Sequence, residues 1–204
     1  MIILIGGVGC AGKTLMAQKL LERYKVPYFS IDHLKMGIYR SDDNCGFTPL
    51  DSSEHIGGKL WGILKGIIMT NIENKQHLII EGIYLMPEKI RELELDEEYA
   101  PEIISFYMFF SEDYIERNYR SDIVGHQNAI EDRDCEEDGD MKSYMKKEFY
   151  AEANAIVKKI CEDGGAKYFE IDGEYNQEIK KIYEWIDEQI NKKGYGRLFC
   201  GGDN

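Results

Sequence analysis

A glycine-rich loop close to the start of the chain constrains its fold more than any other segment. A short apolar run at residues 2–5 comes before the loop, and a helical pattern of apolar residues follows it. The loop consists of Gly7, Val8, Gly9, Cys10, Ala11, Gly12, Lys13 and Thr14. In the spacing Gly-x-x-x-x-Gly-Lys-Thr, successive backbone N–H groups turn inward, and the positive end of the following helix assists them. The loop is therefore predicted to cradle phosphate groups.

The last two residues of this loop indicate which phosphates are held. Lys13 is expected to reach the β- and γ-phosphates of a nucleotide, and the Thr14 hydroxyl is expected to hold Mg²⁺. The chain contains no Asn-Lys-x-Asp segment of the kind that reads guanine. Cys10 is interpreted as a small filler within the loop rather than as a nucleophile. The predicted ligand is therefore ATP together with Mg²⁺.

The rest of the chain alternates between strand-like and helix-like segments. Strands are expected at residues 2–5, 28–31, 77–81, 103–110 and 167–171, and helices at residues 14–24, 33–40, 54–74, 112–121, 142–162 and 176–192. Such alternation implies parallel strands joined by right-handed crossovers. The predicted fold class is α/β, a three-layer sandwich with a five-stranded parallel sheet in a single domain.

The charge and the cysteine content of the chain limit the kinds of partner and compartment that are expected. The formal net charge is −13 and the pI is about 4.8, which makes nucleic acid and anionic membranes unfavourable partners, although simple solubility also explains the acidity. Five cysteines are scattered without a Cys-x-x-Cys pair, which favours the reducing cytoplasm. No apolar run approaches the roughly 20 residues that a membrane span needs. The sequence does not indicate an oligomeric state.

Two carboxylates follow predicted strands. Ligands of parallel α/β sheets lie beyond the carboxyl ends of the strands, so Asp32 and Glu81 are both expected to face the γ-phosphate. Glu81 is predicted to position Mg²⁺, where Asp is the usual residue; the alternative is a solvated carboxylate at a strand end. Asp32 is predicted to accept a proton from an acceptor hydroxyl, and it could also be the N-cap of the helix predicted from His33.

These motifs together resemble the small-molecule kinases of the P-loop superfamily, the relatives of adenylate kinase. The resemblance rests on the loop at 7–14, on Ser30-Ile31-Asp32, on Ile80-Glu81-Gly82 and on the arginines near 117–120. The Ser-x-Asp segment is similar to zeta-toxin-like and chloramphenicol phosphotransferase-like kinases, and the segment from Ile80 to Pro87 somewhat resembles 2-phosphoglycerate kinases. The Asp-Gly-Phe-Pro-Arg segment of adenylate kinases is absent, which argues against a nucleoside monophosphate as acceptor.

The resemblance divides the single domain, residues 1–204, into functional parts. It implies an acceptor-binding insertion at about residues 33–74 and a helical lid at about 113–147. The lid contains a strongly acidic stretch at residues 131–140, interpreted as a solvated tip. Residues 194–204 are predicted to form a flexible tail.

The resemblance also implies roles for several side chains. In such kinases a lid brings arginines to the charge that develops during transfer, so Arg117 and Arg120 are expected to be catalytic, ahead of Arg133. Arg117 and Arg120 are three residues apart and are predicted to share a helix face. Surface ion pairs with neighbouring acids are the alternative.

Two further sites follow from the same comparison. The loop after the fifth strand, with Asp172, is expected to border the adenine ring. Lys35 and Arg40 are the best pair for an anionic acceptor, although each alone is more commonly a surface or core residue.

The expected function is that of an ATP-dependent kinase that transfers the γ-phosphate to a hydroxyl of a small molecule. The alternatives are a nucleoside monophosphate kinase and, third, a nucleotide-binding regulatory ATPase. The identity of the acceptor is not indicated by the sequence.

Overall fold

The computed structural model of the protein describes residues 1–126 and 146–196. It contains a five-stranded sheet in the order β2-β3-β1-β4-β5, in which every neighbouring pair is parallel. The strands are β1 (Ile2–Gly7), β2 (Tyr28–Ser30), β3 (Leu78–Glu81), β4 (Ile103–Phe110) and β5 (Tyr168–Ile171). The predicted α/β class and the five parallel strands are confirmed.

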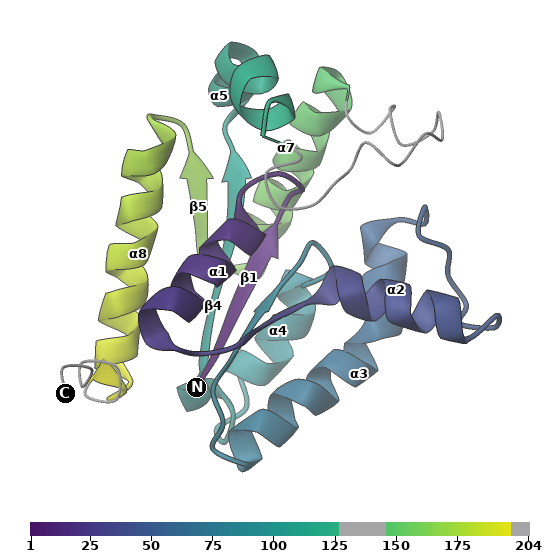
Figure 1. Cartoon of the computed structure of the whole chain (residues 1–204), viewed down its shortest axis with the longest axis vertical. Helices are drawn as coiled ribbons and strands as arrows, with labels where there is room; N and C mark the ends of the chain where they lie inside the picture. The colour runs from purple at the N-terminus through teal and green to yellow at the C-terminus, as the bar shows by residue number, and fades with distance from the viewer. Residues whose placement is uncertain (127–145, 197–204) are drawn as a thin grey trace.

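Helices cover both faces of this sheet and complete the three layers (Figure 1). The α-helices of the described residues are α1 (Lys13–Tyr24), α2 (Ile31–Ser41), α3 (Ser53–Glu73), α4 (Pro87–Glu94), α5 (Glu112–Asn118), α7 (Lys147–Gly164) and α8 (Tyr175–Lys192). Helices α1 and α8 lie next to each other on one face, where α1 packs on β1 to β3 and α8 on β4 and β5. Helices α3, α4 and α7 cover the other face.

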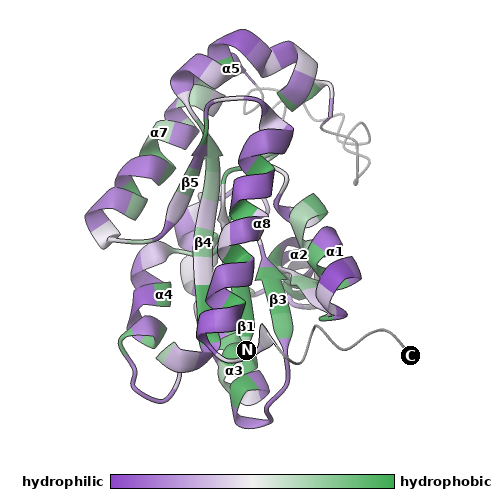
Figure 2. Cartoon of the chain, turned by 90° about the vertical axis from the view of Figure 1, so that its left-hand side faces the viewer, coloured by the Kyte–Doolittle hydropathy of each residue, from purple (hydrophilic) through white to green (hydrophobic). Residues whose placement is uncertain are grey.

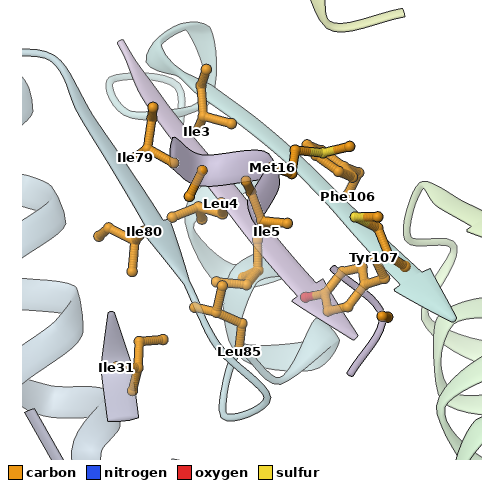
Figure 3. Close-up of a cluster of buried hydrophobic side chains, with 14 of the residues drawn as sticks. Ile3, Leu4, Ile5, Met16, Ile31, Ile79, Ile80, Leu85, Phe106 and Tyr107 are labelled. Atoms are coloured by element: carbon orange, nitrogen blue, oxygen red, sulfur yellow. The ribbon is translucent and has the colours of Figure 1, made fainter. Parts of the chain in front are cut away.

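The central strand β1 is buried along its whole length, as expected of a parallel strand that is covered on both faces. Figure 3 shows Ile3, Leu4 and Ile5 of β1 among side chains from the neighbouring strands, with Met16 of α1 beside them. In Figure 2 the hydrophobic colour concentrates on the strands, while the outer faces of the helices are hydrophilic. The buried side chains therefore stabilise the sheet. The loops described below follow the carboxyl ends of its strands.

The sequence pattern missed helix α4. Pro87 occupies its first turn, where a missing N–H costs nothing. Only two apolar side chains after that proline, Ile90 and Leu93, are buried, so the helix presents too short an apolar stripe for a periodicity argument.

Other boundaries differ from those expected. The predicted helix at 112–121 ends at Asn118 and continues as a π-helical segment, Tyr119–Val124. Helix α7 begins at Lys147, while residues 142–145 of the predicted helix lie outside the described residues, as do the acidic lid stretch and residues 197–204 of the tail. No helix in the described ranges is long and apolar enough to cross a membrane.

Candidate active site

The glycine-rich loop has the backbone geometry that its sequence predicts. Gly7 and Gly12 have φ angles of 123° and 85°, and Cys10 has a φ of 55°, so the loop uses conformations that favour glycine. A Cβ atom at Gly7 would collide with the backbone of Met108 in β4, and the Val8 N–H donates to the Met108 carbonyl at 3.2 Å. The loop is therefore held tightly against the carboxyl end of β4.

Two tyrosines that sequence reasoning missed support this loop. The Tyr150 hydroxyl, from the first turn of α7, donates to the Gly9 carbonyl at 2.6 Å. The Tyr175 hydroxyl, at the start of α8, lies 3.4 Å from the Ala11 carbonyl, and a Cβ atom at Gly12 would collide with it. Because both tyrosines lie far from the loop in sequence, no local pattern could have identified them.

Lys13 lies at the start of α1 and is only 6% exposed. Its ammonium donates to the Val8 carbonyl at 2.5 Å, a bond that keeps the side chain folded over the loop. This position agrees with a lysine that meets phosphates bound by the backbone N–H groups.

Glu81 ends β3 and is 2% exposed. Burial raises the pKa of its carboxyl, the Lys13 ammonium and the nearby Ser30 and Thr14 hydroxyls counter that rise, and Asp32 adds to it. Its Oε1 atom is buried without a hydrogen-bond partner among the described residues. A buried, unsatisfied carboxylate oxygen close to the Thr14 hydroxyl suits a hard cation such as Mg²⁺, which binds oxygen ligands.

No group of three or more His, Cys, Asp or Glu side chains that could hold a metal occurs in the described ranges. Mg²⁺ at nucleotide sites is commonly bound through one or two protein oxygens together with substrate phosphates. The metal role of Thr14 and Glu81 stays a prediction.

The sheet register brings the two predicted carboxylates to the same edge. Ser30 of β2 pairs with Glu81 of β3, and Glu81 pairs with Ile5 of β1. Asp32 and the start of the glycine-rich loop at Gly7 each follow this line by two residues. Both carboxylates therefore lie at the carboxyl end of the sheet beside the phosphate loop.

Asp32 belongs to the first turn of α2, which begins at Ile31 with Ser30 as its N-cap residue. The alternative that Asp32 caps a helix starting at His33 is therefore wrong, because the helix starts two residues earlier. An acidic residue in a first turn is favoured by the helix dipole, and the Asp32 side chain is 40% exposed.

Lys35 and Arg40 do not form a free pair of cations. Lys35 donates to Asp32 Oδ1 at 3.2 Å and to the Tyr84 hydroxyl at 2.9 Å, and its side chain is only 12% exposed. Arg40 lies exposed in the last turn of α2 and pairs with no carboxylate of residues 1–126 or 146–196. Lys35 is thus already paired with Asp32, whereas Arg40 is exposed, and the binding of an anionic acceptor by the two residues stays a prediction.

The two arginines that are expected to act in a lid lie in different local structures. Arg117 is in the last turn of α5 and donates to the Asp172 carbonyl at 2.8 Å, beside the loop after β5. Arg120 lies in the π-helical segment and is exposed, so the regular helix expected to place both arginines on one face is interrupted between them. Arg133 lies outside the described residues.

A cavity of about 280 Å³ opens between α1 and α8, next to the phosphate loop. It is lined by Gly12, Leu15, Met16, Lys19, Tyr175, Asn176, Ile179, Lys180 and Tyr183. Its walls are mainly apolar, with Lys19 and Lys180 as its only cationic lining residues. The cavity therefore offers apolar surface directly beside the phosphate loop.

Comparison with solved structures agrees with this fold. No protein-family model and no curated protein matches the sequence. The chain is similar to a gluconokinase from Sinorhizobium meliloti 1021, with a TM-score of 0.54 and 14% identity over 94% of this chain and 96% of that chain. It is similar to a thymidylate kinase from Candida albicans, with a TM-score of 0.54 and 15% identity over 94% and 92%.

A shikimate kinase from Bacteroides thetaiotaomicron is similar as well, with a TM-score of 0.51 and 11% identity over 92% of this chain and 98% of that chain. The matches extend over nearly the whole length of both partners in each case. The chain therefore has the fold of the P-loop kinases that act on small molecules, as the resemblance of its motifs implies.

Proposed function

We propose that this chain is an ATP-dependent kinase that transfers the γ-phosphate to a hydroxyl group of a small molecule. The observation that carries the proposal is the common edge where the phosphate loop, Glu81 and Asp32 meet. A loop alone binds a nucleotide, whereas a solvent-accessible carboxylate beside the same edge can meet a second substrate.

The donor half of the reaction belongs to the loop. Its backbone N–H groups and the Lys13 ammonium bind the phosphates of ATP and balance the negative charge that develops as the γ-phosphate leaves. Thr14 and Glu81 are the residues that would hold Mg²⁺. When bound there, the ion supplies electrostatic neutralisation of the phosphate oxygens.

Adenine and ribose are assigned to the end of the site formed by the Arg117–Asp172 contact and the cavity between α1 and α8. That cavity begins at Gly12, so a nucleotide whose phosphates occupy the loop has an apolar recess directly beside it. The absence of a guanine-reading segment favours ATP.

Asp32 is assigned to the acceptor. As the acceptor oxygen forms its bond to the γ-phosphorus, its proton passes to the carboxylate of Asp32. The bond between the γ-phosphorus and the bridging oxygen breaks at the same time, and ADP leaves with that electron pair. Arg120 is the lid arginine we assign to the transferring group, since Arg117 contacts Asp172.

The acceptor is expected to enter beside α2 and α3, within the insertion at about residues 33–74, and the lid is expected at about 113–147. We expect the protein to act in the cytoplasm on a small molecule, without nucleic acid or membrane partners. The strong negative charge of the chain supports this expectation, because it disfavours polyanions.

The test is a coupled assay of ADP formation with MgATP and a panel of acceptors: gluconate, shikimate, glycerate and glucose against AMP, CMP, UMP and dTMP. Turnover with a hydroxyl compound and none with the nucleotides is expected. Robust turnover with any nucleotide would favour the nucleoside monophosphate kinase instead, and acceptor-independent hydrolysis alone would favour the regulatory ATPase. Asp32→Asn is expected to keep ATP binding, measured by calorimetry, and to lose transfer by at least about 100-fold.

A further inference from the structure

The position of Asp32 depends on two residues that come from different parts of the chain. Lys35 lies one turn further along α2 and donates from Nζ to Asp32 Oδ1 at 3.2 Å. The same ammonium donates to the Tyr84 hydroxyl at 2.9 Å and lies 5.3 Å from the centre of the Tyr84 ring. Lys35 is therefore held from two sides, and it holds one oxygen of Asp32.

Tyr84 is itself firmly placed. It lies between β3 and α4 and is only 4% exposed. Two glycines allow this loop to approach its neighbours: a Cβ at Gly82 would lie 2.9 Å from Ile31 Cβ, and one at Gly57 would lie 3.0 Å from the Tyr84 carbonyl oxygen. Close packing against α2 and α3 thus holds Tyr84 in place. The Tyr84 hydroxyl in turn holds the Lys35 ammonium.

The charge on Lys35 is retained in this setting. Burial acts to lower the pKa of the ammonium, but the Tyr84 hydroxyl and the Asp32 carboxylate outweigh burial, so the pKa of Lys35 lies above its ordinary value. Lys35 therefore stays a charged donor to Asp32 Oδ1.

The two oxygens of Asp32 are not equivalent. Oδ1 accepts from Lys35, whereas Oδ2 has no hydrogen-bond partner in residues 1–126 and 146–196. With 40% of its side chain exposed, Asp32 can present Oδ2 to a molecule that arrives from solvent. One oxygen is anchored and the other is open.

We propose that Lys35 and Tyr84 are positioning residues that anchor Asp32 Oδ1 and leave Oδ2 to receive the proton of the acceptor hydroxyl. This inference rests on the proposed kinase function and gives Lys35 a different role from binding an anionic acceptor. Lys35 gives up no proton during the reaction, and Tyr84 acts only through Lys35. Because the lysine charge is already paired with Asp32, the acceptor portion beside Asp32 is uncharged.

The experiment measures ADP formation from MgATP by the full chain, with the acceptor found in the panel above and with water alone. Lys35→Met is expected to lower kcat by about 10- to 100-fold, since it removes a hydrogen bond to a charged group, and Tyr84→Phe by about 3- to 10-fold. The KM for ATP is expected to stay within about twofold in both variants, because the phosphate loop is not altered. Lys35→Arg is expected to restore part of the activity.

Combining the substitutions separates positioning from a merely structural effect. If Tyr84 acts through Lys35, Tyr84→Phe adds less than about twofold in the Lys35→Met background, and neither change lowers the residual rate of Asp32→Asn. Tyr84→Phe keeps the ring that packs against Lys35, so folding is preserved, which thermal unfolding checks. Lys89→Met on α4 and Tyr168→Phe on β5 are the matched controls, because the Lys89 ammonium and the Tyr168 hydroxyl hydrogen-bond to the exposed Glu92 and Glu162.

Each other outcome overturns a different claim. Fully multiplicative losses, wild-type turnover in Lys35→Met, or an equal rise in the KM for ATP would overturn the positioning role. A panel in which only carboxylate- or phosphate-bearing acceptors react, with Lys35→Met raising their KM alone, would restore Lys35 as an anion-binding residue. Wild-type turnover in Asp32→Asn would instead overturn the role of Asp32 in the proposed function itself.

Discussion

Arg117 donates from Nη2 to the carbonyl oxygen of Asp172 at 2.8 Å, which joins the end of α5 to the loop after β5. The Asp172 carboxylate lies 3.8 Å from the same nitrogen and accepts a hydrogen bond from the Ser111 hydroxyl. The resemblance of the motifs implies that Arg117 acts at the transferring phosphate and that Asp172 borders the adenine. Because the two residues are in contact, we propose that both act at the nucleotide end of the site.

Arg117 is consequently expected to contribute to nucleotide binding more than to the chemical step. Arg117→Met should raise the KM for ATP about fivefold and leave kcat within about twofold, since it removes binding that ground state and transition state share. Arg120→Met should lower kcat by more than about tenfold. Steady-state kinetics with varied MgATP measure both, and a loss confined to kcat in Arg117→Met would return that arginine to the phosphate.

Tyr150→Phe tests the support of the phosphate loop from α7. The Tyr150 hydroxyl is buried and donates to the Gly9 carbonyl, so its removal should cost about 1 kcal/mol and lower Tm by about 2–4 °C. A less well-ordered loop should also bind ATP a few-fold more weakly. Calorimetry and thermal unfolding measure the two effects, with Tyr168→Phe as the control that should leave ATP affinity unchanged.

Alkylation of Cys10 should block nucleotide binding, because an added group would crowd the loop that is predicted to hold the phosphates. Cys10 is partly exposed, whereas Cys161 is buried and burial raises the pKa of its thiol to about 12, so Cys161 should react slowly. Iodoacetamide treatment followed by ATP titration measures the loss.

Two controls define this experiment. MgATP present during alkylation should protect binding, and a Cys10→Ser variant should bind ATP after the same treatment. Loss of binding in the treated Cys10→Ser variant would assign the effect to another cysteine.

Adjacent glycines of α3 provide a matched pair. Gly57→Ala places a Cβ 3.0 Å from the Tyr84 carbonyl oxygen, which should destabilise the fold and displace Tyr84, so that turnover falls. Gly58→Ala meets no atom within 4 Å and should stabilise the helix by up to about 1 kcal/mol. Chemical unfolding and ADP formation distinguish the two variants; equal stabilisation by both would show that the close approach at Gly57 is not needed.

A pH dependence of stability is expected where α5 meets the π-helical segment. The Tyr114 hydroxyl donates to Asp122 at 2.7 Å and, with Ser121, holds the pKa of the Asp122 carboxyl below its ordinary value of 3.8. A depressed folded-state pKa contributes stability that is fully present well above pH 3.8 and is lost as the pH falls through the folded-state value.

Tyr114→Phe should therefore lower the free energy of unfolding at pH 7 by on the order of 1 kcal/mol, after allowance for solvent screening. The difference from the unmodified protein should shrink as the pH falls below 3.8, because Asp122 is then protonated in both states. Urea unfolding of both proteins at pH 7 and below pH 3.8 measures this difference in the free energy of unfolding. A difference that does not change with pH would contradict the assigned hydrogen bond.

The parts of the fold that sequence predicted share a strong local signal. The glycine spacing fixed the conformation of residues 7–14, and continuous apolar runs marked β1 and β4 because strands covered on both faces need them. Helix α4 gave no such signal, since only Ile90 and Leu93 are buried after its proline. The π-helical segment after Asn118 depends on local packing rather than on a residue pattern.

The candidate site shows the same division. Lys13, Asp32 and Glu81 could be found because each stands at a fixed distance from a strand end. Tyr84 and Tyr150 could not, because their partners lie 49 and 141 residues away and only the folded chain brings them together. The contact between Lys35 and Asp32 could be expected from helical spacing, because the two residues are three apart. The contact between Lys35 and Tyr84 could not.

The hydroxyl of Tyr150 connects the first turn of α7 to the phosphate loop through a single bond. Coupling of this kind acts in both directions with equal free energy. A ligand that orders the phosphate loop must therefore also favour one placement of the start of α7, and anything that displaces that turn must alter the affinity for phosphate by the same factor.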